Sequence, residues 1–174
     1  AVVAVAKRDT VVAYLELLRH AGLQVEALEI GPVAIQRLVS TFSEMEDYQN
    51  VLAINFGHEL SYMTMISGRR LLFDQQMDFG EKGLIDQLAQ TLEMDTEAVR
   101  RLVYQFGIWS QTKGPSSSAV ISSSDVTDSL MEIVKPSFLA LVEEVKRALI
   151  YAASETRGEP VKKVYLLGSI ARWR

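Results

Sequence analysis

The sequence predicts an α/β fold built around a mixed β-sheet with helices on both faces. Strand-like and helix-like segments alternate along the chain, which is the pattern of a sheet covered by helices. Three strand-like segments also follow one another directly, over residues 51–55, 60–67 and 70–77, before the next helical segment begins. Strands joined by short turns pair antiparallel, so we expect an antiparallel edge on this sheet.

The first part of the chain alternates between strand and helix patterns. Runs of valine and alternating apolar residues predict strands, whereas apolar residues at three- and four-residue spacing predict helices. A polar linker, SEMEDYQN, closes this part. The four expected elements are a strand over 1–6, a helix from Asp9 or Thr10 to His20, a strand over 23–30, and a helix from Pro32 toward Phe42.

Beyond the three consecutive strands, the pattern becomes mainly helical. A Ser/Gly/Pro-rich stretch predicts a mobile loop over 111–124. Pro136 predicts a kink or a break near Glu132, because a proline ring meets the carbonyl four residues before it. The expected elements are helices over 81–92, from the Asp95 cap to Phe106 and over 126–154, and then a buried strand over 161–168.

Composition narrows the classes of function. The 174 residues carry a net charge of −4 and a pI near 5.3, which disfavours nucleic acid as a partner. The chain has no cysteine, and His20 and His58 have no ligand spacing, so we expect no metal site. Without a signal peptide or a long apolar run, we expect a soluble, cytoplasmic domain. Because both ends look like cuts within a fold, we also expect a longer parent protein.

The turn between the first two of the consecutive strands is the sharpest candidate site. A phosphate-binding hairpin needs glycine for close backbone approach and hydroxyl groups that donate to phosphate oxygens. Gly57 and Ser61 suit these roles, and Asn55 precedes them. Glu59 counts against an anion, because it brings a second negative charge. A plain hairpin that uses Gly57 for its turn is the competing interpretation.

The second candidate is the pair Gly168-Ser169, which follows the last predicted strand. A strand that ends in Gly-Ser can present backbone N–H groups to a nucleotide. Most such pairs are ordinary turns, so this signal is weak alone. Gly80 and Gly83 open a helix, but Glu81 in its first turn already complements the helix dipole.

The order of these elements resembles a known family. The stretch from Val51 to Leu92 is similar to the start of the second domain of actin-like ATPases, especially the PilM branch of type IV pilus assembly proteins, related to FtsA. Gly68-Arg69-Arg70-Leu71-Leu72-Phe73 and Phe79-Gly80 match the family pattern. The resemblance spans nearly the whole chain and implies an actin-like (ribonuclease H-like) mixed sheet in an incomplete two-domain arrangement.

Within that arrangement, the resemblance implies two domains. Residues 1–48 correspond to part of the first domain, with the exit from its small inserted subdomain. Residues 49–174 correspond to the second domain. It also implies an ATP site formed by Asn55, Gly57, Ser61, Gly168 and Ser169.

The departures from the family pattern concern this ATP site. Asn55 replaces the aspartate that positions Mg²⁺, and Ser61 is the only matching hydroxyl in the turn. Gly168-Ser169-Ile170 replaces a run of glycines. We therefore expect a degenerate site and no catalytic residue, with ATP and Mg²⁺ as the ligands to test.

If a member of this family has lost ATP hydrolysis, the function that remains is the binding of a partner protein. The resemblance implies a cytoplasmic scaffold that grips the N-terminal tail of a PilN-like inner-membrane protein and thereby reaches the membrane and the pilus motor components. Two alternatives stay open: an active ATP-binding PilM/FtsA-like ATPase, and a GspL-like cytoplasmic domain of a type II secretion system.

Overall fold

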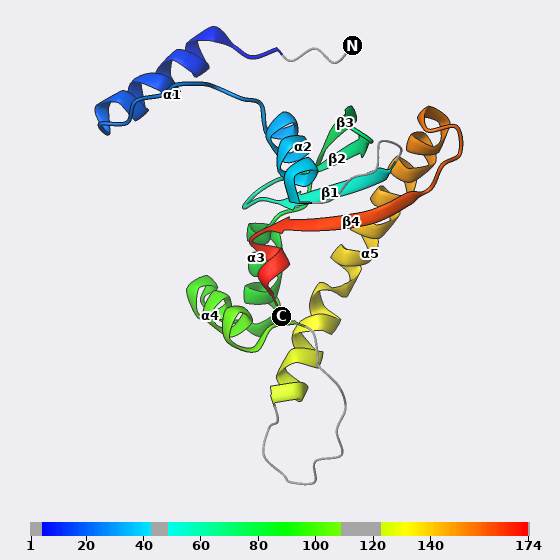
Figure 1. Cartoon of the computed structure of the whole chain (residues 1–174). Coiled ribbons are helices and arrows are strands. Elements are labelled where there is room, and N and C mark those ends of the chain that lie inside the picture. Colours follow the sequence, from blue (N-terminus) through cyan, green and yellow to red (C-terminus); the bar gives the residue numbers. More distant parts are fainter. Residues whose placement is uncertain (1–4, 43–48, 109–122, 174) are drawn as a thin grey trace.

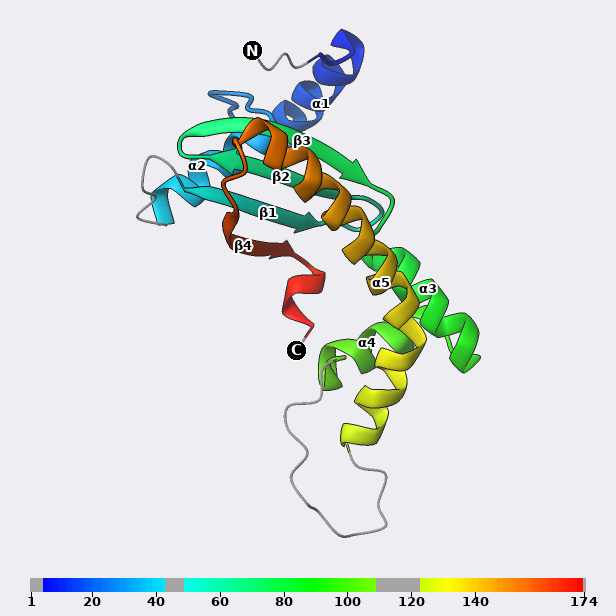
Figure 2. The ribbon, with the colours of Figure 1, turned by 90° about the vertical axis from the view of Figure 1, so that its right-hand side faces the viewer.

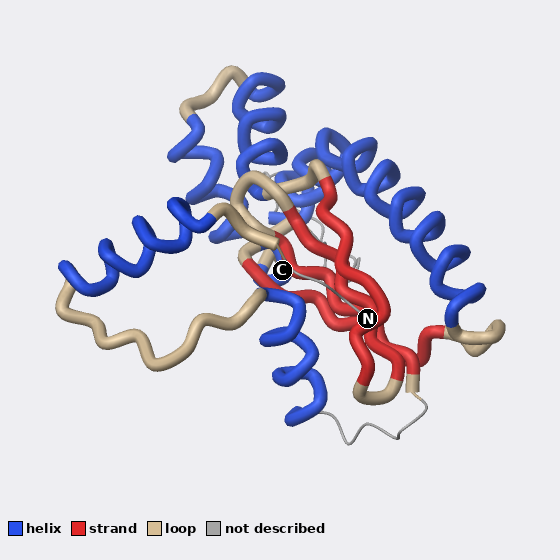
Figure 3. Tube along the Cα trace, turned by 90° about the horizontal axis from the view of Figure 1, so that it is seen from above, coloured by secondary structure: helices blue, strands red, loops and turns tan. Residues whose placement is uncertain are grey.

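The computed structural model describes residues 5–42, 49–108 and 123–173 (Figure 1). Four strands lie side by side in one sheet of order β3-β2-β1-β4 (Figure 3). Neighbouring strands are antiparallel except for β1 and β4, which run parallel. The predicted mixed sheet is therefore confirmed. Its strands are β1 (Asn50–Phe56), β2 (Ser61–Ser67), β3 (Arg70–Met77) and β4 (Val161–Gly168).

Both faces of the sheet carry apolar side chains, because the residues of β1 are apolar at nearly every position. Val51 and Ala53 face helix α2 (Gly31–Phe42) in a small cluster with Val39 and Ile66. The alternate residues of β1 belong to the larger core, which three helices cover from the other side (Figures 1 and 2). These helices are α3 (Glu81–Leu92), α4 (Thr96–Phe106) and α5 (Ser123–Glu155).

Local signals place most of the helices. The side chain of Asp95 accepts hydrogen bonds from the backbone N–H groups of Glu97 and Ala98, at 2.9 and 3.4 Å, which confirms the predicted cap of α4. Helix α5 continues through Pro136, so the expected break is not found. Most of the predicted mobile loop lies outside the described residues; its last two positions, 123 and 124, begin α5.

One strand prediction is wrong, and a second falls mostly outside the described residues. Residues 23–30 form no strand and are all exposed, because no described strand lies beside them to pair with their backbone. Residues 5 and 6 are not in a strand either, and 1–4 lie outside the described part. Strand β4 exists, but it is an edge strand: Val164 and Leu166 are both 55% exposed, so the strand is not buried.

Helix α1 (Arg8–His20) lies away from the sheet (Figure 1). Its bounds agree with the predicted helix, and its basic residues Arg19 and His20 complement the dipole in the last turn. None of its residues is buried. This segment and the extended residues that follow it therefore contribute nothing to the core.

Candidate functional site at the carboxyl ends of two parallel strands

The predicted site residues lie at one end of the sheet. Because β1 and β4 are parallel, their carboxyl ends meet there, and Phe56 is the register partner of Gly168. The backbone N–H of Ser169 donates to the carbonyl of Phe56 at 3.3 Å, which joins the two chain turns. Ligands of open α/β sheets bind at such ends of the strands. The structure thus brings Asn55 and Gly57 close to Gly168 and Ser169.

The hydroxyl of Ser61 points into the protein. Ser61 is fully buried, and its Oγ donates to the carbonyl of Phe79 at 2.5 Å. This bond holds the start of β2 against the loop that leads into α3. The Oγ of Ser169 is also shielded from solvent, and it finds no hydrogen-bond partner among the described residues. The two hydroxyl groups of the predicted site therefore differ: that of Ser61 donates a hydrogen bond within the protein, whereas that of Ser169 has no partner among the described residues.

The turn after β1 packs closely against the start of α3. The backbone N–H groups of Glu81 and Lys82 donate to the carbonyls of Gly57 and His58, at 3.1 and 2.8 Å. The first turn of α3 is thus capped by the protein's own backbone. The N–H groups of Glu81 and Lys82 are already occupied and cannot serve an anion.

The same contacts fix the direction of the turn's peptide groups. The described residues contain no cis peptide bond, and a trans peptide holds its N–H opposite its carbonyl. Because the carbonyls of Gly57 and His58 point toward α3, the N–H groups of His58 and Glu59 point away from it. Two successive N–H groups that share a direction form an anion-binding element. The turn therefore retains one feature of a phosphate hairpin.

Close packing explains why Gly80 is a glycine. A Cβ at this position would lie 2.4 Å from the carbonyl oxygen of Glu59 and 2.6 Å from that of His58. Both are backbone atoms, which cannot move without breaking the contact between the turn and α3. Gly83, one turn along in α3, has nothing within 4 Å of its Cβ direction.

These two glycines predict opposite effects of alanine. We expect Gly80→Ala to lower the free energy of unfolding by about 2 kcal/mol, because the methyl group overpacks the turn. Gly83→Ala should raise it by about 0.5 kcal/mol, since alanine is the better helix former in open space. Urea unfolding of both variants beside the unmodified chain measures the difference. Equal effects of the two substitutions would contradict the packing seen here.

A buried carboxylate beside the turn was not predicted as a site residue. The side chain of Glu81 is only 6% exposed, and its Oε1 accepts from the Tyr104 hydroxyl at 2.9 Å and from Arg100 at 3.2 Å. Nδ1 of His58 lies 4.0 Å from its other oxygen. The ring of Tyr104 packs edge-on against Trp173, with centroids 6.5 Å apart. Arg100 and Tyr104 lie four residues apart and therefore on one face of α4. This spacing is the signal in the sequence from which a shared partner of the two side chains could have been predicted.

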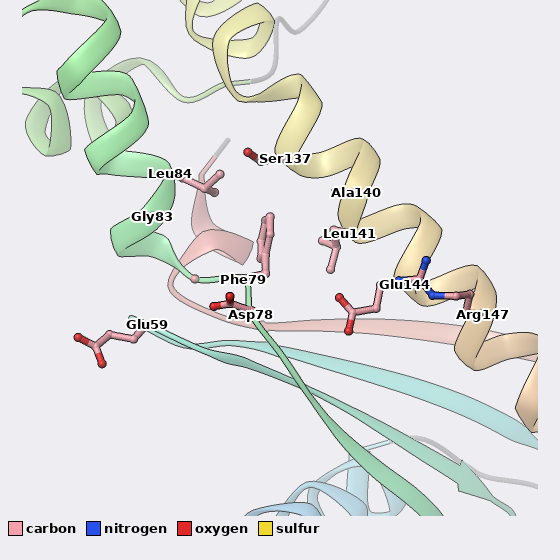
Figure 4. Close-up of a pocket in the computed structure, with 11 residues that line it drawn as sticks. Glu59, Asp78, Phe79, Gly83, Leu84, Ser137, Ala140, Leu141, Glu144 and Arg147 are labelled. Carbon is pink, nitrogen blue, oxygen red and sulfur yellow. The ribbon is translucent and has the colours of Figure 1, made fainter.

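A cavity of about 400 Å³ lies between the start of α3 and the second half of α5 (Figure 4). Phe79, Leu84 and Leu141 supply its apolar wall, and Asp78 and Glu144 supply carboxylates. None of the predicted site residues lines the cavity, although Glu59, Phe79 and Gly80 connect it to the turn after β1. The full lining is Glu59, Asp78, Phe79, Gly80, Gly83, Leu84, Ser137, Ala140, Leu141, Glu144 and Arg147.

Two further classes of site, a metal centre and a membrane-spanning helix, are absent from the described residues. Within residues 5–42, 49–108 and 123–173, no three histidine or carboxylate side chains gather closely enough to hold a metal ion. In the same ranges, no helix combines the length and the apolar character that crossing a bilayer requires.

Comparison with solved structures identifies the architecture. Over 97% of its length, the chain superposes on a chain of a PilM-PilN type IV pilus biogenesis complex, with a TM-score of 0.72 and 20% identity. The fold is actin-like. MreB 5 of Spiroplasma citri bound to AMPPNP matches over 97% of this chain, with a TM-score of 0.63 and 13% identity. The archaeal actin homolog Ta0583 matches over 84%, with a TM-score of 0.50 and 12% identity.

The actin-like chain is shorter than each of these proteins. It spans 43% of the matched chain of the PilM-PilN complex, 55% of MreB 5 and 44% of Ta0583. No protein-family model matches the sequence, and no curated protein is similar enough to count as a relative. At these identities the likeness establishes the fold.

Proposed function

We propose that this protein is a PilM-like scaffold of a type IV pilus-like assembly machine. In this proposal residues 1–48 belong to a first actin-like domain and residues 49–174 form the second. The protein works in the cytoplasm and binds the N-terminal tail of a PilN-like inner-membrane protein, through which it reaches the membrane and the pilus motor. The observation that carries the proposal is the superposition on a chain of the PilM-PilN complex, because it covers 97% of the chain with a TM-score of 0.72.

The proposal includes a degenerate nucleotide site, at which we expect neither binding nor hydrolysis of ATP. Asn55 supplies an amide where Mg²⁺ favours a carboxylate. The Ser61 hydroxyl, which a phosphate would need as a donor, is buried and bonded to the carbonyl of Phe79. Glu59 adds a mostly exposed negative charge to the turn, and its partner Lys82 lies 3.5 Å away. These features support a binding protein over an ATPase.

A second candidate function is ATP binding without decay of the site. The shared direction of the His58 and Glu59 N–H groups favours it, because such a pair suits a phosphate oxygen. A matching actin-like structure, MreB 5, holds AMPPNP. In this alternative Asn55, Gly57, Ser61 and Gly168 surround ATP and Mg²⁺.

Binding of a tail peptide tests the scaffold function. The probe is a fluorescent synthetic peptide with the N-terminal cytoplasmic sequence of the PilN-like protein from the same organism, and its scrambled form is the control. We expect saturable binding of the native sequence, measured by fluorescence anisotropy, and a much weaker response to the scrambled one. Equal binding of both peptides would remove the support for a PilN-like partner.

Titration of Mg-ATP separates the two candidates. For the scaffold with a lost site, isothermal titration should show no heat at millimolar ATP, and the melting temperature should not rise. Micromolar binding that Gly57→Trp abolishes would establish the second candidate instead. The melting curve of Gly57→Trp is the control, because a Cβ at Gly57 would lie 2.2 Å from the carbonyl oxygen of Leu60, and the variant must be folded for its loss of binding to count.

A further inference from the structure

Helix α5 connects two layers of the molecule. Its first half packs beside α3 and α4, where Leu130 and Val134 are buried (Figure 1). Its second half lies over the sheet (Figure 2). There the ring of Tyr151 packs against that of Phe73, with centroids 5.7 Å apart, and Glu144 accepts from Gln75 at 3.2 Å. A single helix of 33 residues thus belongs to both layers.

Pro136 lies between the residues of α5 that are buried beside α3 and α4 and those that contact the sheet. Proline has no backbone N–H, so the carbonyl of Glu132 receives no bond from the position four residues later. The proline ring also crowds that carbonyl. Helices bend most readily where such a backbone hydrogen bond is missing. The weakest turn of α5 therefore lies between these two parts of the helix.

A side chain from α3 spans this turn. Nε2 of Gln87 donates to the carbonyl of Ile133 at 2.7 Å, and Oε1 of the same amide accepts from the Ser137 hydroxyl at 2.8 Å. One partner precedes the proline and the other follows it. Gln87 thus bonds to α5 on both sides of the missing backbone hydrogen bond, and its side-chain amide acts as donor and acceptor at once.

We propose that Pro136 is a joint in α5 and that Gln87 is the latch that holds the joint in the conformation seen here. Release of the latch allows the second half of α5 to tilt relative to α3. The cavity of Figure 4 lies in the angle between these two helices, because Gly83 and Leu84 line it from α3 and Ser137 and Leu141 line it from α5. The state of the latch therefore sets the width of the cavity.

Spin labels on the two halves of α5 measure the tilt directly. The chain contains no cysteine, so Asp128→Cys and Ala153→Cys, both at exposed positions, give one clean label pair. A straight helix separates their backbones by about 38 Å, a distance suited to double electron–electron resonance. We expect one narrow distance distribution in the parent chain and a broader, shorter one after Gln87→Ala. Adding Pro136→Ala should restore the narrow distribution, because alanine supplies the N–H that can donate to the carbonyl of Glu132.

Gln90→Ala is the matched control, since Gln90 is an exposed glutamine on the same helix. It should leave the distances unchanged. Should Gln87→Ala unfold the chain, Ser137→Ala removes one bond of the latch with a smaller disturbance. Hydrogen exchange of the amides of 137–140 should then be about tenfold faster than in the parent chain. Equal distances, or equal exchange, in the latch and control variants would overturn the proposal.

Discussion

Replacing Gly168 by alanine should lower the free energy of unfolding by about 3 kcal/mol, the sum of backbone strain and a steric clash. Gly168 has a φ of +90°, a conformation that residues with a side chain rarely adopt. Its Cβ would lie 2.0 Å from the carbonyl oxygen of Phe56 and 2.8 Å from the carbonyl carbon. Neither strand can retreat, because Phe56 and Gly168 are register partners. Urea unfolding followed by circular dichroism measures the loss.

Gly158 supplies the control for the clash. It has nearly the same φ, +84°, but nothing lies within 4 Å of its Cβ direction. Gly158→Ala should therefore cost only the backbone strain, about 1 kcal/mol. The difference between the two variants isolates the close approach of β1 and β4. A loss of the same size at both positions would mean that the carboxyl ends of the two strands do not meet as described.

Leu52→Ala should lower the free energy of unfolding by about 3 kcal/mol, because it leaves a cavity in the main core. Leu52 is fully buried at the centre of β1, between β2 and β4 and beneath the helices. Both the melting temperature and the urea concentration at the midpoint of unfolding should fall. The slope of the free energy of unfolding against urea concentration should stay the same if the native state stays compact.

Leu166→Ala is the matched control on the same face of the sheet. Leu166 is the register partner of Ile54, but it is 55% exposed because β4 is an edge strand. The same truncation should therefore cost well under half as much as at Leu52, since fewer contacts are lost. A cost at Leu166 as large as that at Leu52 would show that the face of β4 is covered.

Local patterns carried most of the predictable structure. The three consecutive strands follow from alternation, and the start of α4 follows from the capping side chain of Asp95. Each of these signals lies within a few residues of the element that it specifies. Such elements need no knowledge of the rest of the chain, and the structure has them where the sequence predicts them.

Predictions that required distant partners were less secure. The pattern of 23–30 is strand-like, but a strand exists only beside another, and none of the described strands lies there. In the candidate site, the family resemblance implied that Asn55, Gly57, Ser61, Gly168 and Ser169 belong together. It did not reveal that the Ser61 hydroxyl bonds to Phe79 or that Glu81 is buried against α4, because these contacts span 18 to 23 residues.

The lack of buried side chains in α1 has a consequence for proteolysis. A helix of 13 residues is marginal in water without tertiary contacts, and residues 21–30 expose their backbone to any protease. Among the described residues, limited digestion should therefore cut first in this stretch and release α1. The remaining fragment keeps both hydrophobic clusters intact. It should consequently melt at the same temperature as the uncut chain. Helix α1 can therefore contact another molecule without lowering the stability of the sheet.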